Sequence, residues 1–458
     1  MILEVTKQLA EFAVNIRYES IPAAVRDQAK VAIADSIGTV FTGLKEESVT
    51  LLHQLAASEF RDGHSTVLGS TARLTDAGAA FANAASAHAL DYDSLSLPVG
   101  FVATAVLFPL LAVAEEEGNV SGRELLSAFT AGYEVEVAIA RGLGVHHWSK
   151  GWHSTSTLAH FGAAVGVARL LKLDVERMRD AIGLAASESS GLRNMMGNMV
   201  KVFHMAKAAR NGVFAARLAQ RGFTAHLSSI EAEWGYCNSF NGVGNYDLET
   251  MLKGLGAQYD LVEPGLVVKV YPCCGLIHSA LDGLFDLMSE HDFTADKVSR
   301  VQLRVHELVP RTLCFNRPRT TYEARFSAHF CIATALQEGA LNLSHFSEGR
   351  LHDGRLQRLM ERVEMVVHPE LHGDATFLQN EFTEIRIELL GGKAFERRIY
   401  RVNNRGSGGR PIELEERKQK FLECTQGHVE RVRSERAFKL LTELETVSDV
   451  REIVASLR

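Results

Sequence analysis

Apolar residues in roughly the first 260 positions recur at the spacing of helices. Between residues 25 and 44, positions such as Val25, Ala29 and Ala32 are three or four residues apart and fall on one face of a helix. Pro22 stands where the first turn of a helix tolerates proline, and Gly43 stands where a helix can end. The pattern predicts a helix between these two residues.

The same spacing returns in several later stretches, which are 76–90, 103–117, 122–142, 155–172, 175–190 and 204–221. Small residues, among them Ala82, Ala84, Ala85 and Ala87, would let neighbouring helices approach closely. We find no repeat of fixed period, which argues against a solenoid. The first part of the chain is therefore predicted to be all-helical.

The pattern changes after Pro264-Gly265. Apolar and polar residues now alternate, as in half-buried strands, over 298–306, 362–368, 383–390 and 396–402. Gly391-Gly392-Lys393 separates the last two stretches and indicates a hairpin turn. Helical spacing lies between the strands, at 275–291 and 320–338. Strands mixed with helices after a helical first part predict a separate α+β domain.

A polar, glycine-rich stretch at 403–411 leads back to helical patterns at 414–423, 435–442 and 446–456. We expect this tail to pack on the first helical part, which makes the α+β unit an insertion. The predicted fold class is therefore mainly α, with an all-helical domain of residues 1–265 and 403–458 and a smaller α+β domain of residues 266–402.

Composition narrows the class of protein. The 458 residues carry a formal net charge of −7, which argues against a nucleic-acid binder with a basic face. The six cysteines show no CxxC spacing, so neither a disulfide scaffold nor an iron–sulfur cluster is indicated. The N-terminus lacks a signal pattern, and no apolar run approaches the ~18 residues of a membrane span. We expect a soluble, reduced, cytoplasmic protein that contacts neither membrane nor nucleic acid.

Two segments in the first part combine polar residues with apolar surroundings. In HALDYDS, His88 and Asp91 would share a helix face, where a carboxylate can orient an imidazole or act as a base, and Asp93 follows. In GWHSTSTLAHFG, His153 precedes hydroxyls that include Ser154 and Thr155 at a helix start, a place that suits anions. The alternatives are a helix end with solvated acids and an ordinary capped helix.

Two further segments are rich in cations. In NMVKVFHMAKAARNG, Lys201, His204, Lys207 and Arg210 recur every three residues and drift over one side of a helix without any acid between them. Such crowding can lower the pKa of a lysine and attract polyanions. In GLVVKVYPCCGLIHSALDG, an apolar run precedes Lys269, and Tyr271, Cys274 and His278 follow. A desolvated lysine is a candidate base or carboxylate partner; the alternatives are a surface lysine and a buried structural cysteine.

Several familiar signatures are missing from the sequence. There is no GxGxxG after a strand, no GxxxxGK[ST], no HExxH and no GxSxG. Nucleotide cofactors, zinc protease chemistry and the serine hydrolase elbow therefore have no support.

Taken in order, these segments resemble the MmgE/PrpD family, which includes 2-methylcitrate dehydratase, cis-aconitate decarboxylase and iminodisuccinate epimerase. The resemblance covers essentially the whole chain, from LAEFAVNIRYESIPAAVRDQAKVAIADSIGTVFTG through HALDYD, GWHSTSTLAHFGAA, NMVKVFHMAKAARNG, KVYPCCGLIHSALD and RPRTTYEARFSAHF to GRPIELEERKQKF. It implies a large helical domain with an inserted α+β lid, an active site in the cleft between them, a homodimer, and no metal or organic cofactor.

The resemblance also implies site residues. The family's catalytic aspartate matches Asp91, its histidine matches His153, and its two lysines match Lys201 and Lys269. One departure concerns Val102, which stands where many members carry a histidine, and decarboxylases often have histidine at the position of Cys274.

We therefore expect proton transfer next to a carboxylate of a small di- or tricarboxylate, since cations in a water-poor cleft stabilise an enediolate. The expected catalytic residues are Asp91, His153, Lys201, Lys269 and Cys274; the expected substrate-binding residues are Asp93, Ser154, Thr155, His204, Lys207, Arg210 and Tyr271. A dehydratase-type lyase is the main hypothesis. An epimerase or isomerase of an amino- or hydroxy-dicarboxylate is the first alternative, and a decarboxylase or a non-catalytic carboxylate binder is the second.

Overall fold

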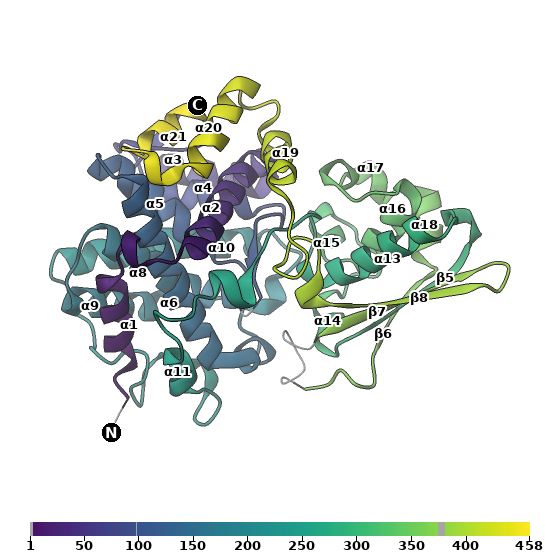
Figure 1. The fold of residues 1–458 in the computed structure, drawn as a ribbon, viewed down its shortest axis with the longest axis horizontal. Helices are drawn as coiled ribbons and strands as arrows, with labels where there is room; N and C mark the ends of the chain where they lie inside the picture. Colours follow the sequence, from purple (N-terminus) through teal and green to yellow (C-terminus); the bar gives the residue numbers. More distant parts are fainter. Residues whose placement is uncertain (1–2, 98, 374–380) are drawn as a thin grey trace.

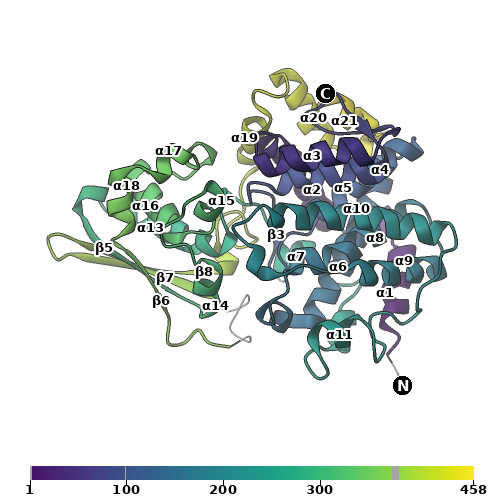
Figure 2. The same ribbon diagram turned by 180° about the vertical axis from the view of Figure 1, so that it is seen from behind.

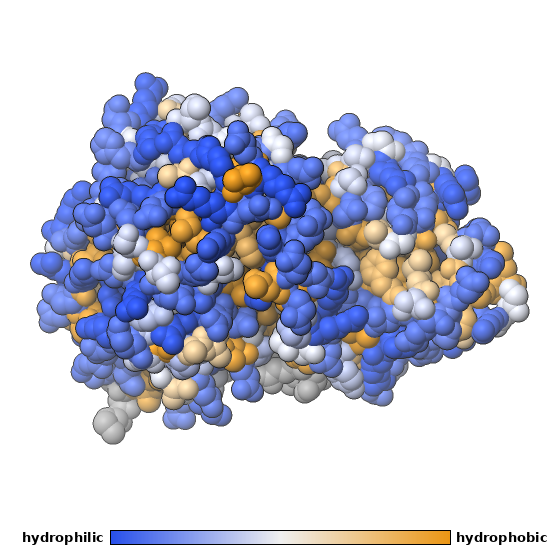
Figure 3. All heavy atoms as spheres, turned by 45° about the horizontal axis from the view of Figure 1, so that its top comes forward, coloured by the Kyte–Doolittle hydropathy of each residue, from blue (hydrophilic) through white to orange (hydrophobic). Residues whose placement is uncertain are grey.

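The computed structural model describes residues 3–97, 99–373 and 381–458. A larger helical part and a smaller α+β part lie side by side, as Figure 1 and the view from behind in Figure 2 both show. The predicted fold class, mainly α with an α+β domain, is confirmed. Figure 3 shows one face that is mostly hydrophilic, with hydrophobic side chains scattered over the helical part and a patch of them on the α+β part.

Helices of the first part pack around a centre made by α4, α5, α8 and α10. They are α1 (Val5–Asn15), α2 (Ala23–Gly43), α3 (Glu47–Glu59), α4 (Asp76–His88), α5 (Ala103–Glu117), α6 (Gly122–Ser149), α7 (Ser154–Thr157), α8 (Ala159–Leu170), α9 (Val175–Glu188), α10 (Val200–Gln220), α11 (Tyr236–Asn241) and α12 (Leu248–Leu252). Two short strands, β1 (Ser65–Thr66) and β2 (Arg73–Leu74), pair beside them.

Small residues set the spacing of the central helices, as the sequence predicted. All residues of α4 after Asp76 are buried. Between α8 and α10, a Cβ atom added at Gly212 would lie 2.2 Å from the Cβ of Ala163, so only glycine allows this approach. The predicted helix ends were less accurate. Helix α6 continues to Ser149 across a break at Gly144, where φ is +61°, and the stretch 155–172 divides into α7 and α8.

A four-stranded sheet forms the α+β part, in the order β6-β5-β7-β8. The strands are β5 (Val298–Val305), β6 (Val363–Val367), β7 (Phe382–Leu389) and β8 (Ala394–Tyr400). Strand β5 runs parallel to β6 and antiparallel to β7, and β7 and β8 form the predicted hairpin. Helix α13 (His278–Glu290) packs on β7 and β8. The other helices are α14 (Leu308–Thr312), α15 (Thr321–Ala324), α16 (Ala328–Glu338), α17 (Glu348–Leu351) and α18 (Gly354–Met360).

After the sheet, the chain returns to the helical part. Helices α19 (Leu414–Thr425) and α20 (Arg431–Thr442) pack on α2, and α21 (Arg451–Ser456) packs on α20. One hydrophobic cluster joins residues between 5 and 268 to residues between 412 and 457, and a second cluster joins residues between 271 and 387. The domain boundaries at 266 and 402 stay a prediction. Within the described residues, no helix combines the length and the hydrophobicity needed to span a bilayer.

Candidate active site

A two-stranded ribbon brings two distant segments together. Strands β3 (Leu95–Ser96) and β4 (Leu266–Val267) pair antiparallel, with Leu95 opposite Val267. Helix α4 has already ended at His88, and Asp91 takes a left-handed backbone conformation with φ of +54° in the turn before β3. Because the strands run antiparallel, this turn lies beside the residues that follow β4, which include Lys269.

Asp91 holds two lysine ammonium groups at once. Lys201 Nζ, from the first turn of α10, donates to Asp91 Oδ1, and Lys269 Nζ donates to Asp91 Oδ2 at 2.5 Å and to the Asp91 carbonyl oxygen. All three residues are buried, with 3%, 5% and 0% of Asp91, Lys201 and Lys269 exposed. The ring of Phe101 lies 4.8 Å from Lys201 Nζ and 5.1 Å from Lys269 Nζ.

The charge state of Asp91 follows from this arrangement. Burial by itself would raise the pKa of the carboxyl group, but the ammonium groups of Lys201 and Lys269 outweigh it and hold the pKa of Asp91 well below its usual range. Asp91 is therefore a fixed anion at neutral pH.

His88 pairs with the neighbouring acid, Asp93, and not with Asp91 as the sequence suggested. The prediction that His88 shares a helix face with Asp91 is wrong, because α4 ends at His88. Instead His88 Nδ1 lies 3.1 Å from both carboxylate oxygens of Asp93, and Thr104 Oγ1 donates to Asp93 Oδ2 at 2.7 Å. Asp93 and His88 are each 0% exposed, so they form a buried pair behind the turn.

His153 precedes α7 and contacts a second histidine. Its Nδ1 lies 2.9 Å from Nδ1 of His204 on α10. Burial, the nearby His204 and Lys201 all lower the pKa of His153, and burial with Lys207 lowers the pKa of His204 to about 4. His153 is therefore neutral near pH 7.

The remaining cations of α10 have partners of their own. Lys207 Nζ donates to the carbonyl and the hydroxyl oxygens of Ser190, each at 2.7 Å, and Arg210 donates to Asn211 Oδ1. Burial lowers the pKa of Lys207 to about 8. The crowding of cations that the sequence suggested lowers the pKa of Lys207 less than its burial does.

A cavity of about 100 Å³ lies between the helical part and the α+β part. Six of the predicted site residues line it, namely Asp91, His153, Ser154, Thr155, Lys201 and Cys274. Its other walls are mostly apolar and include Leu97, Phe101, Trp148, Met196 and Phe326. Among the described residues, the other predicted site residues lie outside this lining: Asp93, His204, Lys207, Arg210, Lys269 and Tyr271.

Contacts place three of the residues that lie outside the lining. Lys269 and His204 contact lining residues directly and stand behind them. Tyr271 points elsewhere, since its hydroxyl donates to Asp282 Oδ1 at 2.8 Å within the α+β part.

The α+β part contributes lining residues that the sequence analysis missed. Arg401 lines the cavity just after β8 and pairs with Glu381 at 2.9 Å, and Thr312 lines it from the end of α14. Arg401 does follow an alternating strand at the point where the chain leaves the α+β part. That position was the only signal in the sequence, and it does not distinguish Arg401 from other strand-end arginines.

Two positions bear on proton transfer. Burial raises the pKa of the Cys274 thiol to about 12, so this lining residue keeps its proton at neutral pH. Val102 is 0% exposed just before α5, and the described cavity lining does not include it.

The described residues also contain no group of three or more His, Cys, Asp or Glu side chains placed to hold a metal ion.

Comparison with known proteins fits this two-part arrangement. The sequence profile of the MmgE/PrpD N-terminal domain matches residues 7–249, and that of the MmgE/PrpD C-terminal domain matches residues 271–446. The chain belongs to the MmgE/PrpD family. The resemblance drawn from the sequence motifs is thereby confirmed.

Curated relatives of this MmgE/PrpD protein include three cis-aconitate decarboxylases. The one from Aspergillus terreus is 27% identical over 381 residues, which cover 77% of this chain and 75% of the relative. The one from Homo sapiens is 24% identical over 470 residues, which cover 100% and 95%. The one from Mus musculus is 24% identical over 440 residues, which cover 92% and 86%. Membership of a family that contains such enzymes supports an enzymatic role.

Buried histidines make the stability of this protein depend on pH. Burial lowers the pKa of His147 to about 4 and that of His278 to about 3, while the unfolded chain keeps a histidine pKa of about 6.5. Between those values the unfolded state binds more protons than the folded state, so stability is lost as the pH falls from about 6.5. Each such histidine contributes up to about 1.4 kcal/mol per pH unit.

We expect the free energy of unfolding to fall clearly between pH 7 and pH 5, measured by urea denaturation. His147 hydrogen-bonds Asn241 Oδ1 at 2.8 Å and Thr157 Oγ1 at 2.7 Å. A His147→Gln variant, whose side chain does not titrate, should show a shallower decline. Equal slopes in the two proteins would contradict the assignment of His147 as a neutral buried ring.

Proposed function

We propose that this protein is an enzyme that moves a proton at a carbon next to a carboxylate of a small di- or tricarboxylic acid. The observation that carries the proposal is the position of Lys201. Its ammonium group is held by Asp91 at the wall of a cavity that also presents the neutral ring of His153. A fixed cation and a neutral base in one cavity are the two elements that such a reaction needs.

The chemical difficulty lies in the high pKa of the C–H bond. Removing the proton produces an enediolate, whose added negative charge sits on the carboxylate oxygens. An ammonium group within an apolar wall stabilises that charge far more than water would. We assign this role to Lys201, with Lys269 acting through Asp91.

We assign the remaining steps to other lining residues. The neutral His153 accepts or returns the proton on carbon, and the protonated thiol of Cys274 is a second proton donor. Ser154 and Thr155 present hydroxyl groups that can bind a second carboxylate of the substrate. Asp91 was a candidate base in the sequence analysis, but both of its carboxylate oxygens accept hydrogen bonds from lysine ammonium groups, so we assign it to orienting the lysines.

Dehydration is our first candidate reaction. Dehydration requires a base that removes the proton from carbon and an acid that protonates the leaving hydroxyl group. The cavity offers a neutral histidine and proton donors for these two steps. Decarboxylation is the second candidate, because curated relatives carry that name. Loss of CO₂ leaves the same kind of carbanion next to a carboxylate, so Lys201 would serve either reaction.

The test is a panel of small polycarboxylic acids incubated with the protein in deuterated water and followed by NMR and ultraviolet absorbance. Absorbance from a new double bond without loss of CO₂ would identify a dehydratase. Release of CO₂ with one deuterium gained would identify a decarboxylase. Deuterium gained at the α carbon with neither change would identify an epimerase, and binding without any turnover across the panel would contradict the proposal.

A further inference from the structure

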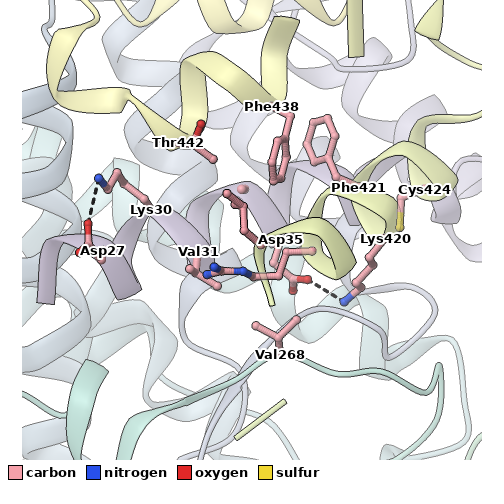
Figure 4. A pocket seen from close by; sticks show the side chains of 14 residues that line it. Asp27, Lys30, Val31, Asp35, Val268, Lys420, Phe421, Cys424, Phe438 and Thr442 are labelled. Carbon is pink, nitrogen blue, oxygen red and sulfur yellow. Dashed lines mark hydrogen bonds and ion pairs between the residues drawn. The ribbon is translucent and has the colours of Figure 1, made fainter. Parts of the chain in front are cut away.

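A second buried ion pair lies behind the candidate active site. Lys420 on α19 and Asp35 on α2 are joined at 2.6 Å, and their side chains are only 9% and 5% exposed. Figure 4 shows the two side chains pointing toward one another between the two helices. This pair comes from the tail of the chain and from its first long helix, far in sequence from the residues of the site.

The pair is bonded to the two segments that carry Asp91 and Lys269. Lys420 Nζ also donates to the carbonyl oxygen of Lys269 at 2.9 Å and to that of Tyr92 at 3.0 Å. Since an ammonium group has three N–H donors, every donor of Lys420 is used. On the other side, the Ser94 amide donates to Asp35 Oδ2 at 2.8 Å.

We infer that Lys420 and Asp35 are positioning residues for the reaction of the candidate active site. The inference depends on the proposed function, because it assigns the pair to keeping Asp91 and Lys269 in register. The turn at Asp91 has a left-handed backbone, and the ribbon of β3 and β4 is only two residues long on each side. So short a ribbon fixes its own ends weakly, whereas the three main-chain bonds of the pair join the two segments just beyond it.

A stabilising role alone does not account for such a pair. Taking two charges out of water costs several kcal/mol per ion, and apolar side chains of similar size are often equally stabilising. The pair instead contributes a defined geometry, because its charge-assisted hydrogen bonds fix the positions of the main-chain atoms that they contact. A displacement of about 1 Å in a catalytic group can lower the rate about 100-fold.

The surroundings supply a matched control. The pair lies in the wall of a cavity of about 300 Å³ whose lining also includes Lys30. Lys30 forms ion pairs with Asp27 at 3.0 Å and with Glu445 at 3.2 Å, and Figure 4 shows the first of these. Among the described contacts, Lys30 bonds neither the Asp91 turn nor the Lys269 segment. Replacing it removes a lysine and two ion pairs from the same cavity without touching the site.

The experiment compares Lys420→Met, Lys420→Arg and Lys30→Met in the full chain. Steady-state kinetics are measured on the acid that the panel identifies, and hydrogen–deuterium exchange is measured on peptides that cover residues 90–95 and 266–270. Lys420→Met is expected to lower kcat by about 10- to 100-fold with KM changed less than about threefold, and to speed exchange in those peptides. Lys420→Arg should restore part of kcat, and Lys30→Met should behave like the wild type.

Wild-type kcat and wild-type exchange in Lys420→Met would overturn the inference. So would exchange that rises equally over the whole chain while activity per folded molecule stays unchanged, since that is the result of a purely stabilising pair. Should Lys420→Met fail to fold, Asp35→Asn replaces the charge-assisted bond from the Ser94 amide with a neutral one and removes the counter-ion that orients Lys420, so it must lower kcat in the same direction by a smaller factor. Should the wild type turn over no acid, the proposed function fails, while the exchange data still decide whether the pair holds the two segments.

Discussion

Replacing Lys201 with methionine is expected to lower kcat/KM by about 100- to 1,000-fold, the range found when one principal electrostatic group is removed from an active site. Methionine keeps most of the aliphatic length of lysine but cannot stabilise an enediolate. Asp91 keeps Lys269 as a counter-ion in this variant, so its carboxylate is not left alone in the interior. The variant should therefore fold, and the measurement is kinetics on the identified acid together with a thermal unfolding curve.

Arg217→Met is the matched control for this prediction. Arg217 lies near the other end of α10 and forms ion pairs with Asp76 at 2.9 Å and Glu117 at 2.7 Å. Its replacement removes a cation and two ion pairs from the same helix but should leave kcat/KM unchanged. If Lys201→Met loses activity only in proportion to its loss of folded protein, Lys201 is a structural residue and the assignment is wrong.

Long helices were predictable because hydrophobic spacing extends over several turns. The stretches at 76–90, 103–117 and 175–190 correspond to α4, α5 and α9 within two residues at each end. Boundaries set by a single backbone angle were not predictable. The break at Gly144 and the left-handed turn at Asp91 each depend on one residue's conformation, which tertiary packing decides.

The site was predictable in its residue types more than in its contacts. A lysine after an apolar run indicated a desolvated cation, and a row of cations without acids indicated a site that attracts polyanions. The structure brings Lys201 and Lys269 to the same carboxylate. Which acid would join them did not follow from local spacing. Asp91 and Asp93 are two residues apart, yet one faces the lysines and the other pairs with His88; the left-handed backbone of Asp91 lies between these two directions.

Contributions from the α+β part were the hardest to predict. Arg401 and Thr312 reach the cavity only because the two parts of the chain meet there. Hydrophobic periodicity describes one element at a time and carries no information on how two domains face each other. The same reason explains why the pair of Lys420 and Asp35, separated by 385 positions, was not predicted.

Asp91→Asn is expected to have the largest effect on stability. It leaves the ammonium groups of Lys201 and Lys269 buried without their shared counter-ion, and removing one partner of a buried pair costs about 3–5 kcal/mol in the free energy of unfolding. In the wild type, the lowered pKa of Asp91 means that its contribution is complete at neutral pH and is lost as the pH falls below about 4. In the variant, the folded state should release a proton that the unfolded chain keeps, so its stability should rise as the pH is raised above 7.

Urea denaturation at several pH values checks this prediction, with Asp76→Asn as the control. Asp76 pairs with Arg217, which keeps Glu117 as a second partner, so the same acid-to-amide change leaves no cation without a counter-ion and should cost less than Asp91→Asn. It should also leave the pH dependence above 7 unchanged. If Asp91→Asn is as stable as the wild type at pH 7 and shows no gain at higher pH, the two lysines are not held there as a pair of cations, and the electrostatic basis of the proposed reaction is lost.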